Sequence, residues 1–332
     1  MTPRAALERL LDAAYINRAE AEGIIDAFLD PTLEPSLAGG AVALLAQRPI
    51  TPDLLTGAVS AIRAAMIPAT TTARTLDTCG TGGDAKGSYN ISTATALLIA
   101  ACGVPVAKHG NRAVSGSVGS ADVLEALGVP LDGDGLDTNG FGFFFAPNHH
   151  PKLAAIGSAR RVLRLRSLFN IAAPLCNPTR PVAQLVGVYS PSLVEVVAHT
   201  LNALGTPRAL VVCSNDGLDE LTPSAPSRVA EVRDGVVIVR YSDAAEAGLP
   251  PCALNDLRGG TVADNAAAIK GLGDGTAPEA FRNAVLYNAA ACLYLYDKVS
   301  TFKEGAAEAK ALLDNGQFQT FLAKITSFSF KQ

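Results

Sequence analysis

A glycine-rich segment, residues 79–93, carries residue types that suit a phosphate group. Gly80, Gly82 and Gly83 stand ahead of an apolar helical pattern. Glycines let backbone N–H groups approach a phosphate without a Cβ in the way, and the following helix points its positive N-terminus at the same place. Asp84 suits a hydroxyl group or a hydrated cation. The segment is neither a Walker A loop nor a GxGxxG turn, so a tight turn with an ordinary helix cap is the competing interpretation.

Further donors follow this segment in the chain. Asn90, Ser92 and Thr93 can cap the helix or donate hydrogen bonds to phosphate oxygens. The run KHGNR, Lys108 to Arg112, then brings two cations, an imidazole and an amide directly after an apolar run. A charge at the first position after a buried strand is costly without a partner, and an anionic ligand is a suitable one. A solvated charged loop is the competing interpretation.

A pair of carboxylates suits a metal ion. Asp219 and Glu220 follow the apolar run 209–213 after a short turn. Mg²⁺ prefers one or two carboxylates together with substrate phosphates, although acids are also frequent at helix N-termini, and the pair alone favours that second interpretation. Ligands of open parallel sheets bind beyond the carboxyl ends of the strands. Taken together, the three segments predict one site for a phosphate-rich substrate and Mg²⁺.

The composition argues against several classes of protein. The 332 residues are 48% hydrophobic and 17% charged, which predicts a folded chain of about two domains. The 27 basic and 31 acidic residues give a net charge of −4, which argues against a nucleic-acid or membrane-surface protein. The six cysteines form no CxxC pair, so neither a disulfide framework nor a zinc site is expected. Without a signal peptide or a membrane-spanning run, a cytoplasmic location is expected.

Two patterns of elements position these segments. The beginning of the chain reads as helices only, and residues 66–73 read as a hinge. From residue 74, short apolar runs alternate with helical segments, which is typical of an α/β fold with a mainly parallel sheet. Helices are expected over 4–14, 19–29, 36–47, 54–66, 93–102, 120–128, 193–205, 283–296 and 304–315, and strands over 74–78, 104–107, 142–146 and 209–213.

The order of short motifs resembles that of the anthranilate phosphoribosyltransferase family. GTGGD, NISTA, KHGNR, GSADVLEALG, GVYS, GLDE and EGAAEAKALLDNG occur in the family's order and approximate spacing, nearly end to end. Each motif is weak alone, whereas the ordered set is highly specific. The segment RRVLRLRSLFN also fits the family pattern Arg-x-x-Leu-Gly-x-Arg-Thr-x-Phe-Asn.

The resemblance implies a fold, a reaction and partners. It implies a fold like that of nucleoside phosphorylases and phosphoribosyltransferases, with a small helical domain over 1–68, joined in space by part of 150–185, and a larger α/β domain over 74–332. It implies transfer of phosphoribose from 5-phosphoribosyl 1-pyrophosphate to the amine of anthranilate in tryptophan biosynthesis, with Mg²⁺. It also implies a homodimer formed through the helical domain.

The resemblance further assigns site residues. Lys108, Arg160 and His109 take part in catalysis, and Ser92, Asp219 and Glu220 hold the metal. Gly80, His109, Asn111 and Arg160 face anthranilate. The residues assigned to phosphoribosyl pyrophosphate are Gly80, Gly83, Asp84, Ser88, Asn90, Ile91, Ser92, Thr93, Lys108, Gly110, Asn111, Arg112, Ser115, Gly116 and Ser120.

The acceptor side departs from the family pattern. Arg164 and Ala173 stand where the family usually has glycine, and Cys213-Ser214 replaces a His-Gly pair ahead of GLDE. The alternatives are therefore a paralogous phosphoribosyltransferase or nucleoside phosphorylase with another aromatic acceptor, and a non-catalytic binding relative. The intact KHGNR run with Arg160 argues against a phosphorylase. The acidic composition and the intact Asp219-Glu220 pair argue against a non-catalytic nucleic-acid-binding relative.

Overall fold

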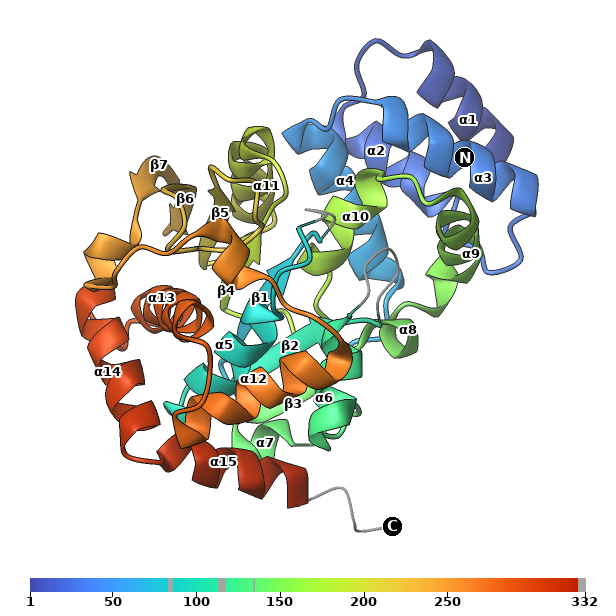
Figure 1. Ribbon diagram of the computed structural model, residues 1–332. Helices are drawn as coiled ribbons and strands as arrows, with labels where there is room; N and C mark the ends of the chain where they lie inside the picture. The colour runs from blue at the N-terminus through green and yellow to red at the C-terminus, as the bar shows by residue number, and fades with distance from the viewer. Residues whose placement is uncertain (83–85, 113–117, 134, 328–332) are drawn as a thin grey trace.

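Four helices at the start of the chain precede a seven-stranded sheet and the helices that cover it (Figure 1). The computed structural model describes residues 1–82, 86–112, 118–133 and 135–327. Four of the predicted site residues, Gly83, Asp84, Ser115 and Gly116, lie outside the described residues. Among the described helices, none combines the length and the apolar character needed to cross a bilayer.

The helical part begins as the sequence predicts. Its first four helices are α1 (Pro3–Asp12), α2 (Arg18–Asp26), α3 (Pro35–Gln47) and α4 (Pro52–Ala65). Asn17 and Glu20 form a capping box at the start of α2. The Thr51 side chain accepts a hydrogen bond from the backbone N–H of Leu54 at the start of α4. These caps satisfy helix N–H groups that have no partner within the helix.

Two later helices return to this part of the molecule. Helix α9 (Ala154–Leu163) packs on α3, and α10 (Leu168–Ala172) packs on α3 and α4 (Figure 1). Helix α4 also packs against α11 (Pro191–Ala203), so one hydrophobic core extends from the helical part to one face of the sheet. We propose the domain division 1–68 with part of 150–185, and 74–332, on the basis of this packing.

The sheet has the strand order β3-β2-β1-β4-β5-β6-β7. Its first five strands in sequence are parallel, and β6 and β7 extend the sheet as an antiparallel hairpin. The strands are β1 (Leu76–Gly80), β2 (Val106–Gly110), β3 (Phe141–Phe145), β4 (Ala183–Gly187), β5 (Arg208–Ser214), β6 (Ser227–Arg233) and β7 (Val236–Ser242). Since β2 and β3 lie on one side of β1 and β4 lies on the other, the strand order reverses between β1 and β4, where open sheets bind ligands.

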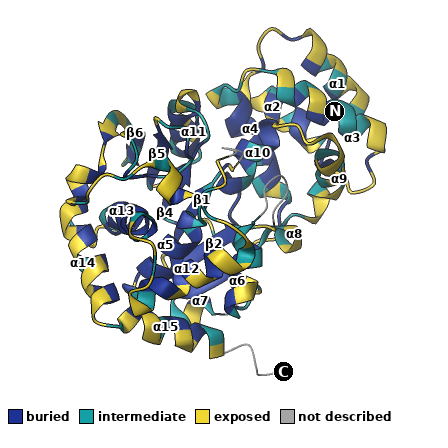
Figure 2. Cartoon of the chain, viewed as in Figure 1, coloured by how far each residue is buried: buried dark blue, intermediate teal, exposed yellow. Residues whose placement is uncertain are grey.

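Side chains alternate between the two faces of the sheet. Leu185 and Leu210 belong to the core under the C-terminal helices, whereas Val186 and Val211 belong to the core shared with α11 and the helical part. Both cores are buried, while the outer surfaces of the covering helices are exposed (Figure 2). The first face is covered by α5 (Ile91–Ala101), α6 (Ser120–Leu127), α12 (Val262–Asp274), α13 (Glu279–Leu295), α14 (Phe302–Asp314) and α15 (Gln317–Thr326).

The remaining described elements are short. They are α7 (Leu136–Asn139), α8 (Ala146–His149) and the 3-10 helices η1 (Pro151–Leu153), η2 (Ala173–Leu175), η3 (Ala244–Ala247) and η4 (Leu254–Leu257). The mainly parallel α/β fold expected from the sequence is confirmed. The sequence patterns did not reveal β4, β6 or β7.

The contact between α2 and α4 predicts opposite effects for two glycine substitutions. A Cβ on Gly57 would lie 2.3 Å from the backbone oxygen of Arg18, whereas a Cβ on Gly23 would have no atom within 4 Å. We expect Gly57→Ala to lower the free energy of unfolding by about 1–3 kcal/mol through overpacking. Gly23→Ala, the matched control on the same helix pair, should raise it by about 0.5–1 kcal/mol. Denaturant titration checks both values, and a Gly57→Ala protein as stable as wild type would contradict this packing.

Candidate active site

The turn that carries Asp219 and Glu220 packs against two glycines, at the ends of the strands β1 and β4 between which the strand order reverses. Gly80, the last residue of β1, pairs with Gly187, the last residue of β4. A Cβ on Gly187 would lie 1.6 Å from the backbone oxygen of Asp219, and a Cβ on Gly80 would lie 2.5 Å from Asp219 Oδ2. The turn therefore approaches both strand ends as closely as only glycine permits.

The two carboxylates connect this turn to the glycine-rich segment and to α5. The backbone N–H of Gly82 donates to Asp219 Oδ2 at 2.8 Å, and that of Ser92 donates to Glu220 Oε1 at 3.0 Å. Glu220 thus lies at the N-terminal end of α5, where the helix dipole favours negative charge, and Asp219 lies against the glycine-rich segment. The carboxyl ends of β1 and β5 and the start of α5 therefore meet, as the sequence predicted.

A buried asparagine that the sequence analysis missed holds the turn from the other side. Asn288 lies in α13 and is fully buried. Its amide donates to the backbone oxygen of Leu221 at 2.7 Å and accepts from the backbone N–H of Leu221 at 3.2 Å. Because Leu221 directly follows Glu220, this pair of hydrogen bonds fixes the end of the turn.

Lys108 lies beneath the site rather than on its rim. The sequence suggested that Lys108 is the first residue after a strand, but β2 continues to Gly110, and the lysine is only 2% exposed. Lys108 Nζ donates to the backbone oxygen of Thr78 at 2.6 Å and to Ser92 Oγ at 3.3 Å. Burial lowers the pKa of Lys108, and the nearby Asp77 carboxylate opposes that shift. In this structure the ammonium group of Lys108 holds the Ser92 side chain by a hydrogen bond from inside the sheet.

Asp77 is a second buried charge, and the sequence analysis read it only as part of a strand. Its Oδ2 accepts from Asn177 Nδ2 at 2.9 Å, and its Oδ1 accepts from the backbone N–H of His109 at 3.4 Å. Burial raises the pKa of Asp77 to about 6, although Lys108 and these hydrogen bonds favour its charged form. Asp77 therefore links β1, β2 and the segment after α10 under the site.

Two imidazoles approach each other beside the end of β2. The Nε2 atoms of His109 and His150 are 3.3 Å apart. Burial lowers the pKa of His109 well below its usual range and that of His150 to about 4, so both rings are neutral at pH 7. The neighbouring His149 binds Ile67, which lies between α4 and β1. Its backbone oxygen accepts a hydrogen bond from the N–H of Ile67 at 2.8 Å, and its Nδ1 lies 3.0 Å from the backbone oxygen of Ile67.

Arginines near the end of α9 lie on the helical side. Arg160 is half-buried, burial lowers its pKa, and its guanidinium makes no hydrogen bond or ion pair with another described residue. Arg164 has a φ of 53°, in the left-handed region where glycine costs least, which explains the family's preference for glycine there. The Arg166 guanidinium lies 5.0 Å from the ring centre of Tyr189, just after β4.

The segment after β2 carries Arg112 and leads to Ser120, two residues assigned to the phosphate donor. A Cβ on Gly110 would lie 2.4 Å from Ser120 Oγ, so Ser120 lies close to the end of β2. Arg112, in contrast, binds Asp122 at 3.0 Å and Glu125 at 2.8 Å, and these carboxylates raise its pKa. Its charge is therefore directed toward α6 in this structure, although the sequence analysis assigned it to the phosphate donor.

The structure also places three further residues that were assigned to the phosphate donor. Asn90 precedes α5 without capping it through its side chain, but its Oδ1 accepts from Thr93 Oγ1 at 3.3 Å. Ile91 is buried at the first position of α5. Asn111 lies just beyond β2, and its Oδ1 accepts from the backbone N–H of Arg112.

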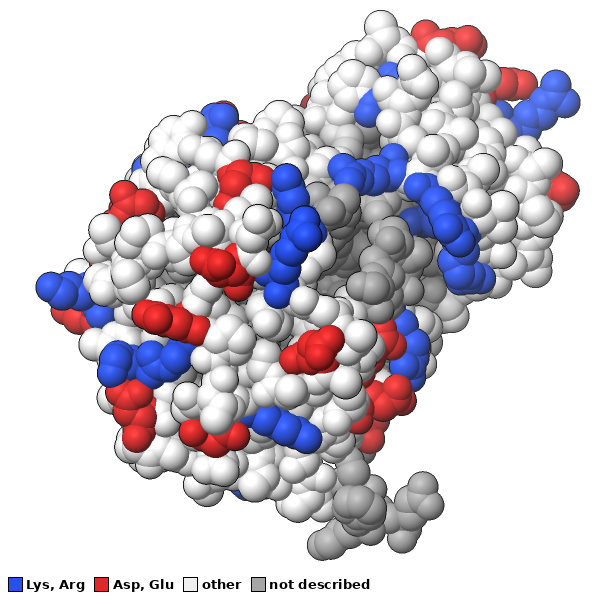
Figure 3. Space-filling view, viewed as in Figure 1, with Lys and Arg blue, Asp and Glu red and all other residues white. Residues whose placement is uncertain are grey.

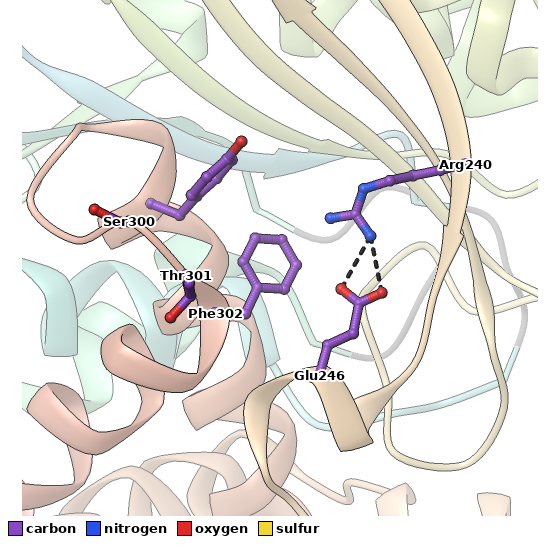
Figure 4. A pocket seen from close by; sticks show the side chains of 6 residues that line it. Arg240, Glu246, Ser300, Thr301 and Phe302 are labelled. Carbon is purple, nitrogen blue, oxygen red and sulfur yellow. Dashed lines mark hydrogen bonds and ion pairs between the residues drawn. The ribbon is translucent and has the colours of Figure 1, made fainter.

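Two cavities differ in their relation to these residues. One of about 170 Å³ is bordered by Ser88 and by Leu218, the residue before Asp219. This cavity lies next to the carboxylate turn. On the surface, Lys and Arg side chains border the hollow between the helical part and the part that contains the sheet (Figure 3). A cavity of about 290 Å³ lies elsewhere, where Arg240 and Glu246 pair with each other beside Phe302 (Figure 4). Because Arg240 and Glu246 neutralise each other, we assign no catalytic role to this second cavity.

The donor set is suited to a hard cation held jointly with a substrate. Asp219, Glu220 and Ser92 offer oxygen atoms, and the described residues contain no group of three or more His, Cys, Asp or Glu side chains able to hold a metal. Mg²⁺ is usually bound through one or two carboxylates plus substrate phosphates rather than by such a cluster. The residues present therefore fit Mg²⁺.

Comparisons with known proteins agree with this geometry. The family model described as "Glycosyl transferase family, a/b domain" matches residues 72–319. An anthranilate phosphoribosyltransferase of Azospirillum brasilense is 43% identical over 98% of this chain and 93% of its own. The crystal structure of the Thermus thermophilus anthranilate phosphoribosyltransferase matches with a TM-score of 0.90 and 35% identity, covering 98% of this chain and 99% of that one.

A more distant structure shares the fold. The Saccharomyces cerevisiae anthranilate phosphoribosyltransferase, solved in complex with PRPP and Mg, matches with a TM-score of 0.85 and 20% identity over 98% of this chain and 97% of its own. The close relatives cover nearly the whole chain, and the structural matches include both the helical part and the sheet. This chain belongs to the anthranilate phosphoribosyltransferase family.

Proposed function

We propose that this protein transfers phosphoribose from 5-phosphoribosyl 1-pyrophosphate (PRPP) to the amine of anthranilate, giving N-(5-phosphoribosyl)anthranilate and pyrophosphate, in tryptophan biosynthesis. The observation that carries the proposal is the link between the Asp219-Glu220 turn, the glycine-rich segment and the start of α5. The 43% identity to an anthranilate phosphoribosyltransferase supports the choice of donor and acceptor.

The donor side provides hydrogen-bond donors rather than a nucleophile. Asn90, Ser92 and Thr93 lie at the N-terminus of α5 and Ser88 lies just before it, and the dipole of that helix favours an anion at this end. Lys108 supports Ser92 from below and adds positive charge to the same end of the helix. As pyrophosphate leaves, positive charge develops at the ribose C1, so this side must position the donor and stabilise the leaving group. No covalent nucleophile is needed.

Ser92, Asp219 and Glu220 would hold Mg²⁺. Once bound, the ion would neutralise charge on the diphosphate as the bond to C1 breaks. The hydrogen bonds from Gly82 and Ser92 position the two carboxylates, one at the glycine-rich segment and one at the start of α5, before the substrate arrives. The distant yeast protein solved with PRPP and Mg has the same fold, which is consistent with this assignment.

The acceptor side combines one cation with a neutral imidazole. Arg160 is half-buried and makes no ion pair within the described residues, so its guanidinium is available to orient the anthranilate carboxylate by a charge-assisted hydrogen bond. We place His109 on the same side, where burial lowers its pKa and keeps its ring neutral at pH 7. The aromatic amine is weakly basic and therefore unprotonated at neutral pH. Its lone pair can attack the ribose C1 with little help from a strong base. We place Asn111 beside this acceptor.

Two copies of the chain and a cytoplasmic location complete the proposal. The helical part exposes the apolar side chains of Met1, Leu11 and Tyr15, which is consistent with a homodimer through that part. A paralogous transferase with another aromatic acceptor is the second candidate, because Arg164 and Ala173 depart from the family pattern on the acceptor side.

The proposed reaction can be followed by the fluorescence of anthranilate. The signal should fall when the protein, Mg²⁺ and PRPP are mixed, and it should persist when Mg²⁺ is removed by a chelator. If calorimetry shows PRPP binding while anthranilate remains unconsumed, the acceptor assignment is wrong and the paralogous transferase becomes the better account. If neither PRPP nor anthranilate binds, the protein is a non-catalytic relative.

Arg160→Ala should affect the two substrates differently. We expect the KM for anthranilate to rise about 10- to 100-fold, because one charge-assisted hydrogen bond contributes about 1.5–3 kcal/mol, while the KM for PRPP changes less than twofold. The neighbouring exposed Arg161→Ala is the matched control and should leave both values unchanged. Equal increases in both KM values for Arg160→Ala would contradict its assigned role.

A further inference from the structure

Residues 87–89 of the glycine-rich segment are held against the end of η4 and the residues that follow it. The backbone N–H of Tyr89 donates to the oxygen of Leu257 at 3.1 Å, and that of Gly259 donates to the oxygen of Gly87 at 2.9 Å. Between these bonds, Ser88 and Arg258 face each other as an antiparallel bridge. These contacts keep Arg258 beside a predicted donor-binding residue, although the two are 170 positions apart in the chain.

The cavity of about 170 Å³ opens beside this bridge. Its polar border consists of Lys86, Ser88, Asn255 and Arg258, and its apolar border consists of Leu218, Leu254 and Leu257. None of these seven residues is acidic. Arg258 is exposed, and its guanidinium makes no hydrogen bond or ion pair with the part of the chain that the structure describes. Because one water molecule occupies about 30 Å³, the cavity has room for a phosphate group.

The position of the cavity relates it to the carboxylate turn. Leu218 directly precedes Asp219, and Ser88 belongs to the same glycine-rich segment as Ser92, so the cavity lies next to the carboxylate turn. Lys108 is buried, and the charge of Arg112 is already engaged by Asp122 and Glu125. Lys86 and Arg258 are the cations that border the cavity.

We propose that Lys86 and Arg258, together with the Ser88 hydroxyl, form a phosphate subsite that binds the terminal phosphate of the diphosphate, both in the donor and in the released pyrophosphate. This inference rests on the proposed function, since it assigns a new part of the same site. Arg258 offers two parallel N–H groups to the phosphate oxygens, and Lys86 adds a point charge. The subsite thus contributes to donor capture and slows pyrophosphate release.

The test compares Lys86→Gln, Arg258→Gln and the double variant with wild type. The inhibition constant of magnesium pyrophosphate and the KM for PRPP should each rise about 10-fold in each single variant and more in the double variant, while the KM for anthranilate changes less than twofold. Lys270→Gln, an exposed lysine on α12, is the matched control and should behave as wild type. Arg258→Lys keeps the charge but loses the paired N–H groups, so its inhibition constant should lie between those of wild type and Arg258→Gln.

Several outcomes would overturn the subsite. They are wild-type inhibition constants in the double variant, an equal loss in Arg258→Lys and Arg258→Gln, or the same loss in Lys270→Gln. Calorimetric binding of magnesium pyrophosphate separates this inference from the proposed function. A wild-type protein that binds pyrophosphate without consuming anthranilate overturns the transferase assignment alone, and weaker pyrophosphate binding by Arg258→Gln then still supports the subsite.

Discussion

The contact of the Asp219-Glu220 turn with two glycines is the constraint on which the rest of the site depends. Gly80 and Gly187 end the two strands between which the strand order reverses, and the backbone of Asp219 occupies the space that a Cβ on Gly187 would need. This approach lets Asp219 reach the N–H of Gly82 and lets Glu220 reach that of Ser92. The sheet edge, the turn and the start of α5 are thereby fixed relative to one another before any substrate binds.

A second layer of charge lies under this contact. Lys108 and Asp77 are both buried, and an unpaired ion at such a depth costs several kcal/mol. The ammonium bonds to Thr78 and Ser92, while the carboxylate bonds to Asn177, so each ion has polar partners in addition to the other charge. Lys108 holds Ser92, and therefore the N-terminal end of α5, from within the sheet. The charged side chains that border the cavity of about 170 Å³ are instead those of Lys86 and Arg258.

The sequence indicated which segments meet at the sheet edge more clearly than it indicated all the strands of the sheet. The glycine-rich segment and the Asp219-Glu220 pair were expected at strand ends, and they meet because parallel strands have their carboxyl ends at one edge of a sheet. The ion pairs of Arg112 with Asp122 and Glu125 on α6 were not foreseen, because such tertiary contacts leave no local signal, and the assignment of Arg112 to the donor stays a prediction. Asp77 and Asn288 looked like ordinary members of apolar elements, since only the fold shows that they are buried beside the turn.

Among the elements, β4 was missed because its five residues carry no clear alternation, although it is a central strand. The hairpin of β6 and β7 did carry a signal that the sequence analysis did not use. Its turn is Asp234-Gly235, and both residues have a positive φ, which is the backbone that this dipeptide favours between antiparallel strands.

The most direct measurement is the gain in PRPP affinity that Mg²⁺ provides, determined by titration calorimetry for wild type and for Gly187→Ala. A methyl group at residue 187 displaces the turn that carries both carboxylates, so the account predicts a large gain for wild type and little or none for the variant, with circular dichroism showing that the variant is folded. An equal gain in both proteins would contradict the account, because the carboxylates would then not depend on that contact for their position.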